Sequence, residues 1–194
     1  MMYAIVKDGS ITATGTLKQL FPNTSFAGGV ANADFKTAEG LMDIVQGEQK
    51  DKQYYFVTEG NIELVDGVPT QKYNNNAKRL NDEDAKDEDG NQLYVQVWDA
   101  DKEEMVNSSE KIINRGLKTS RTAEVKNIAN TRLAKTDWMV IRKYERDVAI
   151  PSATATYRAA VITECARLET AIANAANVDA LAEVMAGQNW PTEG

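Results

Sequence analysis

The chain has no histidine, a single cysteine and no long apolar run, and each absence removes a class of protein. Without histidine there is no ordinary general base near neutral pH, no Ser-His or Cys-His nucleophile pair, and little basis for a zinc site. The lone Cys165 permits neither an intrachain disulfide nor a thiolate cluster. Because Cys165 falls within an apolar helical pattern, we expect a small buried side chain rather than a reactive thiol. The sequence therefore predicts no catalytic residues, no cofactor and no metal ion.

No stretch of the sequence approaches the roughly 20 apolar residues that a membrane-spanning helix needs. Residues 1–8 also lack the basic segment and the longer apolar run of a signal peptide. We therefore expect no membrane partner and take a cytosolic origin as the default. A length of 194 residues with 42% hydrophobic residues is sufficient for one medium domain or two small ones.

The net charge of −7 is unevenly distributed along the chain. Residues 82–104 hold ten acids and two bases, whereas residues 111–146 hold ten bases and three acids. Two interpretations stay open: two solvated faces that partly neutralise each other, or docking of the acidic segment on the basic helix of the same or a neighbouring chain. The overall acidity and the absence of a binding motif argue against a nucleic-acid partner.

The first half of the chain has the pattern of short antiparallel strands and brief helices. Asp8-Gly9 and Asp66-Gly67 are hairpin turn signals. Thr16 and Gln19 form a capping box for a short helix, and Gly40 is placed to end another. We expect strands at residues 3–6, 11–14, 41–46, 54–57, 62–65, 68–73 and 93–98, and helices at residues 17–21 and 34–39.

Residues 74–91 form an acidic, Asn/Asp-rich segment for which a solvated loop is the favoured interpretation. A calcium loop of the EF-hand type is the alternative. With its glycine at Gly90, however, ligand positions one and twelve fall on Ala85 and Gln96, where acids are needed. The spacing therefore argues against calcium.

The second half of the chain is predicted to be helical. Asn107 and Glu110 make a cap pair, and helical spacing is clear from residues 121–133. A charged turn is expected at residues 142–147, and Ser152 is placed to cap a long second helix after Pro151. A final short helix would start at Asn177 and stop at Gly187.

Together these patterns predict an α+β protein with a β-rich N-terminal region of short antiparallel strands, followed by a C-terminal helical hairpin. We place the domains at residues 1–104, which include the acidic loop at residues 74–91, and at residues 105–194.

The predicted corner of the helical hairpin contains the candidate site residues. We expect Trp138 to plug the corner as a core residue and Asp137 to cap backbone donors. Tyr157 and Arg158 would pack on Trp138, with Arg158 available to pair with Asp137. Trp190 would close the fold. The alternative is that these same residues form an interface with a partner.

The sequence around this corner resembles a known family. A charged helix runs into Leu133-Ala134-Lys135-Thr136-Asp137-Trp138, followed by Pro151, by Tyr157-Arg158 at the opening of a second helix, and by a closing Trp190-Pro191. This ordered set resembles a small C-terminal domain of tailed bacteriophages that is described as a tail or tail-fibre assembly chaperone. The segment at residues 20–26 resembles one that accompanies this domain in small phage proteins.

The resemblance implies a non-enzymatic structural component of a phage tail, associated with the baseplate, fibre or tail tip. The alternative is a tail or tail-fibre assembly chaperone that is absent from the mature particle. Expected partners are other phage tail proteins, with a homo-oligomer or repeated copies around a symmetric tail. The expected location is the virion tail, and the host cytoplasm during assembly. A glycan hydrolase would need a carboxylate pair in a cleft, whereas the acids here lie in a loop-like run.

Overall fold

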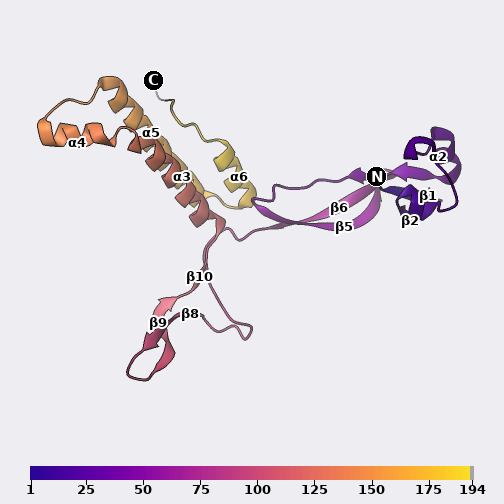
Figure 1. Cartoon of the computed structure of the whole chain (residues 1–194), viewed down its shortest axis with the longest axis horizontal. Coiled ribbons are helices and arrows are strands. Elements are labelled where there is room, and N and C mark those ends of the chain that lie inside the picture. Colours follow the sequence, from indigo (N-terminus) through magenta and orange to yellow (C-terminus); the bar gives the residue numbers. More distant parts are fainter. Residues whose placement is uncertain (193–194) are drawn as a thin grey trace. The chain divides into compact units, whose positions relative to one another are not determined.

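The computed structural model describes residues 1–192 and shows an α+β chain (Figure 1). The chain divides into two compact units, Met1–Asn76 and Ala77–Gly194. Antiparallel strands dominate the first unit and helices the second, so the predicted fold class is confirmed. The boundary lies between Asn76 and Ala77, inside the segment at residues 74–91, whereas the sequence placed it after residue 104.

The first unit begins with a three-stranded antiparallel sheet. β1 (Tyr3–Lys7) lies between β2 (Ser10–Gly15) and β3 (Leu41–Asp43). Asp8 and Gly9 join β1 to β2 with φ angles of 52° and 71°, the left-handed conformation that a tight hairpin turn needs. The hairpin predicted from Asp8-Gly9 is confirmed.

A small aromatic core covers this sheet. The rings of Phe21, Phe26 and Phe35 meet edge to face at centroid distances of 4.9 to 6.2 Å and pack against the buried Tyr3 and Leu41. The helices around this core are α1 (Leu17–Leu20), the 3-10 turn η1 (Ala27–Gly29) and α2 (Ala33–Glu39).

Both predicted helix ends of the first unit are confirmed. The capping box of Thr16 and Gln19 is present at the start of α1. Gly40 ends α2 in the left-handed conformation, where a Cβ would lie 2.3 Å from the carbonyl oxygen of Val6. Only glycine fits that close approach.

A second sheet completes the first unit. β5 (Tyr55–Val65) and β6 (Val68–Ala77) form a long hairpin, and β4 (Val45–Gln46) pairs with β6 in parallel. The strands predicted at residues 54–57 and 62–65 are thus one continuous strand. β6 also extends through residues 74–77, the first part of the segment that was predicted to be a loop.

The second unit opens with strands that the sequence analysis partly missed. These strands are β7 (Glu83–Asp84), β8 (Tyr94–Asp99), β9 (Glu104–Lys111) and β10 (Ile113–Asn114). β8 and β9 pair as an antiparallel hairpin, with Asn107 opposite Gln96 and their side chains hydrogen-bonded. The helix start predicted at Asn107 is therefore wrong. The cross-strand pairing available to β8 overrides a weak capping signal.

A compact joint connects the acidic segment to the start of the helices. The amide of Gly116 donates to the carboxylate of Asp82 at 2.7 Å, and Lys111 pairs with Asp84 at 2.6 Å. The amide of Leu117 donates to the carbonyl of Arg79 at 2.9 Å. These bonds attach residues 79–84 to the start of α3 and place them in the second unit.

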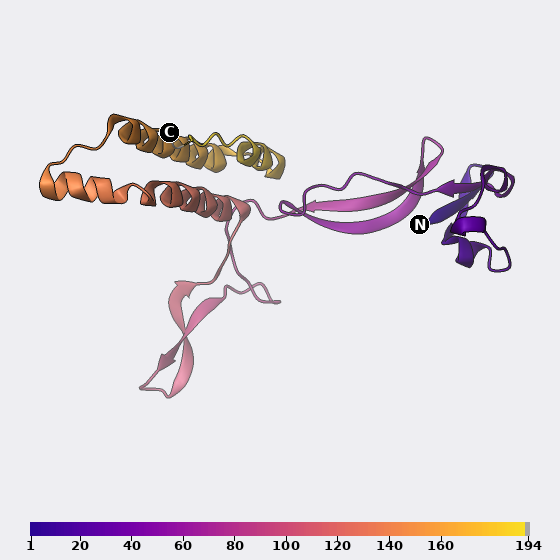
Figure 2. The same ribbon diagram turned by 45° about the horizontal axis from the view of Figure 1, so that its top comes forward.

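Four helices follow: α3 (Leu117–Ala134), α4 (Asp137–Arg146), α5 (Ser152–Asn174) and α6 (Val178–Ala186). α3 and α5 lie side by side in both views (Figures 1 and 2). Their fully buried side chains, together with one from α6, form the core of this unit: Val125, Val161, Leu168, Ile172 and Leu181.

The helix ends agree with the prediction for α6 and differ for α4 and α5. Asn177 caps α6, since its side chain accepts from the amide of Ala180 at 2.8 Å. Ser152 is the first residue of α5, and Pro151 occupies the cap position without a side-chain hydrogen bond. The charged turn predicted at residues 142–147 is wrong, because most of it belongs to α4, which ends at Arg146.

Candidate interaction site

The corner between α3 and α4 is held by Arg158 of α5. One guanidinium nitrogen, Nη1, donates to the carbonyl of Leu133 at 2.8 Å and to the hydroxyl of Thr136 at 2.7 Å. The other, Nη2, lies 2.9 Å from Oδ1 of Asp137. Thr136 is only 6% exposed, so the arginine satisfies polar groups that are withdrawn from water. The predicted pair of Arg158 and Asp137 is present.

Trp138 does not plug this corner. Its side chain is 52% exposed, and the guanidinium of Arg142 lies over its ring at 4.8 Å from the centroid. Asp137 does not occupy the cap position, which belongs to Thr136; it is the first residue of α4, and its carboxylate pairs with Arg158. Both predictions are therefore wrong. The physical reason is that the chain continues into α4, which carries Trp138 away from the α3–α5 contact.

The exposed apolar side chains of α4 form one face of that helix. At 100° per residue they span about half of its circumference. Tyr144 is the most exposed of them, at 92%. No residue of α4 is buried. We define the α4 face as Trp138, Val140, Ile141 and Tyr144.

Tyr157 and Trp190 belong to a different environment, the core between α3 and α5. Tyr157 is buried with Ala129 and Val161, and Trp190 packs against this cluster. The indole of Trp190 donates to the side chain of Gln188 at 2.7 Å, and the guanidinium of Arg132 lies 5.5 Å from its ring centroid. Tyr157 therefore packs near Trp190 rather than on Trp138, and Trp190 closes the fold as predicted.

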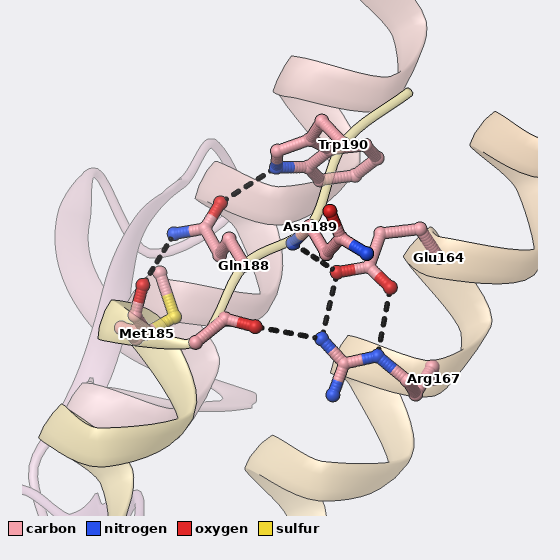
Figure 3. Close-up of polar contacts among 7 residues, drawn as sticks. Glu164, Arg167, Met185, Gln188, Asn189 and Trp190 are labelled. Atoms are coloured by element: carbon pink, nitrogen blue, oxygen red, sulfur yellow. Dashed lines mark hydrogen bonds and ion pairs between the residues drawn. The ribbon is translucent and has the colours of Figure 1, made fainter. Parts of the chain in front are cut away.

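A buried carboxylate that the sequence analysis missed attaches the C-terminal segment to α5 (Figure 3). Glu164 is 8% exposed and accepts two hydrogen bonds from Arg167, both at 2.7 Å, and one from the amide of Asn189 at 2.7 Å. Arg167 also donates to the carbonyl of Gly187 at 3.0 Å.

These bonds set the ionisation of Glu164. The hydrogen bonds from Arg167, and then that from Asn189, hold the pKa of Glu164 below its ordinary value against the opposing effect of burial. Its position three residues after Val161 and four before Leu168, within the buried stripe of α5, was the signal available in the sequence.

A groove lies beside the corner, with a volume of about 570 Å³. The first turns of α5 line it on one side and the C-terminal segment on another. Its lining is small and uncharged: Thr136, Met139, Ser152, Ala153, Thr154, Thr156, Tyr157, Ala160, Pro191 and Thr192. Such a lining suits an apolar or hydroxyl-bearing side chain and offers no acid–base pair for catalysis.

The acidic segment is ordered by its own hydrogen bonds. The carboxylate of Asp87 accepts from the amides of Asp89 and Asn91 and from the side chain of Asn91, which holds its pKa below the ordinary value.

Within residues 1–192, no three acidic or sulfur ligands gather as a metal site would require. None of the helices described is long and apolar enough to cross a membrane.

The hairpin of β8 and β9 presents a second exposed apolar surface. Trp98 and Met105 are cross-strand partners and are 62% and 53% exposed. Glu103 in the turn and Glu104 at the start of β9 precede Met105 in the chain, and the residues described here include no cation paired with either. Like the α4 face, this surface combines aromatic or apolar groups with charge.

These features define an α+β chain whose second unit presents two exposed apolar surfaces. Comparisons with known protein families, with curated proteins and with solved structures find no match to this chain.

Proposed function

We propose that this chain is a non-enzymatic structural component of a bacteriophage tail, associated with the baseplate, fibre or tail tip and acting through protein–protein contacts. The motif around Asp137, Trp138, Tyr157 and Arg158 supports the tail assignment through its resemblance to the phage domain. The exposed apolar surfaces of the second unit separately support action through protein–protein contacts.

The observation that carries the proposal is the exposure of large apolar side chains on elements that cannot bury them alone. The α4 face has no covering element among the residues described, and the β8–β9 hairpin stands as a two-stranded ribbon with Trp98 and Met105 exposed. A two-stranded hairpin is at best marginally stable in water without a third strand or a packed face. Contiguous exposed apolar groups of this kind mark interaction surfaces.

The proposal places the chain in the virion tail, and in the host cytoplasm during assembly. Its partners would be other tail proteins and further copies of itself around the tail axis. The second candidate is a tail or fibre assembly chaperone, since the same exposed surfaces would bind an unassembled partner.

Peptide mass spectrometry on gradient-purified phage particles separates the two candidates. Peptides of this chain at a small fixed multiple per particle, counted against the major capsid protein, are expected of a tail component. Presence in the infected-cell lysate but absence from the particles would overturn the structural assignment and leave the chaperone.

A further inference from the structure

We propose that the α4 face binds the β8–β9 hairpin of a second copy of this chain. This inference deepens the proposed function by naming the contact between repeated copies. It concerns self-association alone, so it can fail while the tail assignment stands.

The α4 side of the contact combines apolar groups with unpaired cations. Arg142 stacks on Trp138, and its Nε is buried without a hydrogen-bond acceptor. Arg146 lies one turn further along the helix, and Lys143 is already paired with Asp147. A carboxylate from a partner would pair with the guanidinium charge of Arg142 at the margin of the apolar face.

The hairpin side has the opposite charge. Trp98 and Met105 form an exposed apolar pair close to the tip of the hairpin. Glu103 lies in the turn, and Glu104 points to the opposite face of the ribbon from Met105. Asp99 is engaged by Lys102 at 3.2 Å, whereas the two glutamates have no cation partner in the part of the chain that the structure describes. Apolar centres with charged margins are the usual anatomy of a protein interface.

The two surfaces are therefore complementary in charge as well as in apolar character. Several acids before the hairpin are engaged within the chain: Asp82 and Asp84 bind Gly116 and Lys111 at the joint, and Asp87 accepts hydrogen bonds from the residues that follow it. The acids at the hairpin tip stay available. α4 carries three bases, Arg142, Lys143 and Arg146, against the two acids Asp137 and Glu145. The α4 face of a second copy is the occupant that charge complementarity favours for the acidic hairpin tip.

The geometry of the second unit favours a contact between copies. The hairpin joins the rest of the unit where α3 begins, and α4 follows the end of α3. An 18-residue helix separates the two attachment points by about 27 Å. A contact between two different surfaces of one chain is heterologous, so its repetition produces rings or filaments rather than isolated dimers. Rings are the symmetry expected of a tail component.

The test uses two charge-reversed forms of the full chain and measures molar mass by light scattering. The α4 variant carries Arg142→Glu and Arg146→Glu, and the hairpin variant carries Glu103→Lys and Glu104→Lys. We expect the wild-type chain to associate more strongly at low salt than at high salt. Each variant alone should associate about 100-fold more weakly, because like charges then face each other.

Mixing the two variants is the decisive step. In the mixture, the acidic wild-type hairpin of the α4 variant can bind the basic wild-type α4 of the hairpin variant. The acidic, charge-reversed α4 of the first variant can likewise bind the basic, charge-reversed hairpin of the second. The mixture should therefore assemble again. Control variants with equal charge changes at exposed positions in the first unit, Lys7→Glu with Lys18→Glu and Glu59→Lys with Glu63→Lys, should associate like the wild type. Circular dichroism checks that every variant is folded.

A monomeric wild-type chain at all concentrations overturns the proposal. So does a mixture of folded variants that stays monomeric, since that result means the hairpin binds α4 within one chain or binds another protein. Neither result bears on the presence of the chain in phage particles, which is measured separately.

Discussion

The guanidinium of Arg158 and the carboxylate of Asp137 lie 2.9 Å apart and connect α5 to the first turn of α4. The two partners differ in their surroundings: the side chain of Arg158 is 16% exposed and that of Asp137 is 54% exposed. Arg158 also donates hydrogen bonds to the carbonyl of Leu133 and to the hydroxyl of Thr136, whereas the carboxylate of Asp137 is largely exposed to solvent. The arginine should therefore contribute more to the stability of the corner than its acidic partner.

Replacing Arg158 tests that asymmetry. Arg158→Ala should lower the free energy of unfolding by about 1–3 kcal/mol, because a buried hydroxyl and a carbonyl lose their donor. Asp137→Ala should cost less than about 1 kcal/mol, as expected for an exposed ion pair. Urea unfolding of both variants measures the difference. Equal losses in the two variants would show that the ion pair, rather than the bonds to Leu133 and Thr136, holds the corner.

The buried carboxylate Glu164 makes stability depend on pH. Its pKa is lowered in the folded chain, so the unfolded chain binds more protons in acid. The contribution of Glu164 is therefore fully present above the unfolded pKa of about 4.3 and is lost as the pH falls through the lower folded value. Glu164→Gln should destabilise the chain at pH 7, and its difference from wild type should shrink in acid.

Urea unfolding at a series of pH values measures that difference. Glu63→Gln, at an exposed position of β5, controls for the loss of one carboxylate. A Glu164→Gln difference that stayed constant from neutral pH into acid would contradict the assignment.

The two tryptophans near the corner should respond differently to removal. Trp190→Ala empties space against Ala129, Tyr157 and Val161 and should cost about 2–4 kcal/mol. Trp138→Ala removes an exposed ring and should change stability by less than about 1 kcal/mol. Thermal unfolding of both variants provides the comparison. A large loss at Trp138 would restore the prediction that it plugs the corner.

Gly116 is the N-cap of α3 and lies close to the chain that crosses the start of the helix. A Cβ at this position would lie 2.4 to 2.6 Å from backbone atoms of Leu80 and Asn81. Gly116→Ala should therefore destabilise the chain by about 1–3 kcal/mol, as overpacking does. The loss of a glycine cap alone would cost only a few tenths of a kcal/mol. Equilibrium unfolding measures the loss, and a loss below about 0.5 kcal/mol would contradict the close approach.

Local signals in the sequence were sufficient for much of the fold. The Asp8-Gly9 hairpin, the capping box of Thr16 and Gln19, the stop at Gly40 and the cap at Asn177 are each specified by adjacent residues and are all present. Such features depend on backbone conformation and on hydrogen bonds within a few residues, so the sequence alone contains them.

Features that depend on distant partners were not predicted. Asn107 has the residue type of a helix cap, but its pairing with Gln96 places it in β9. Tryptophan is a residue type that is usually buried, but the side chain of Trp138 lies on α4 and is exposed. Glu164 is a charged residue in a buried stripe, and its burial depends on Arg167 and on Asn189 of the C-terminal segment. Pairing and burial of this kind are tertiary properties.

Immunogold electron microscopy of purified phage particles, with an antibody against this chain, shows directly whether the chain is a structural part of the tail. We expect gold label confined to the tail, at the baseplate, fibres or tip. Label on the capsid, or particles without label beside a labelled lysate, would contradict the claim that the chain is a structural component of the tail.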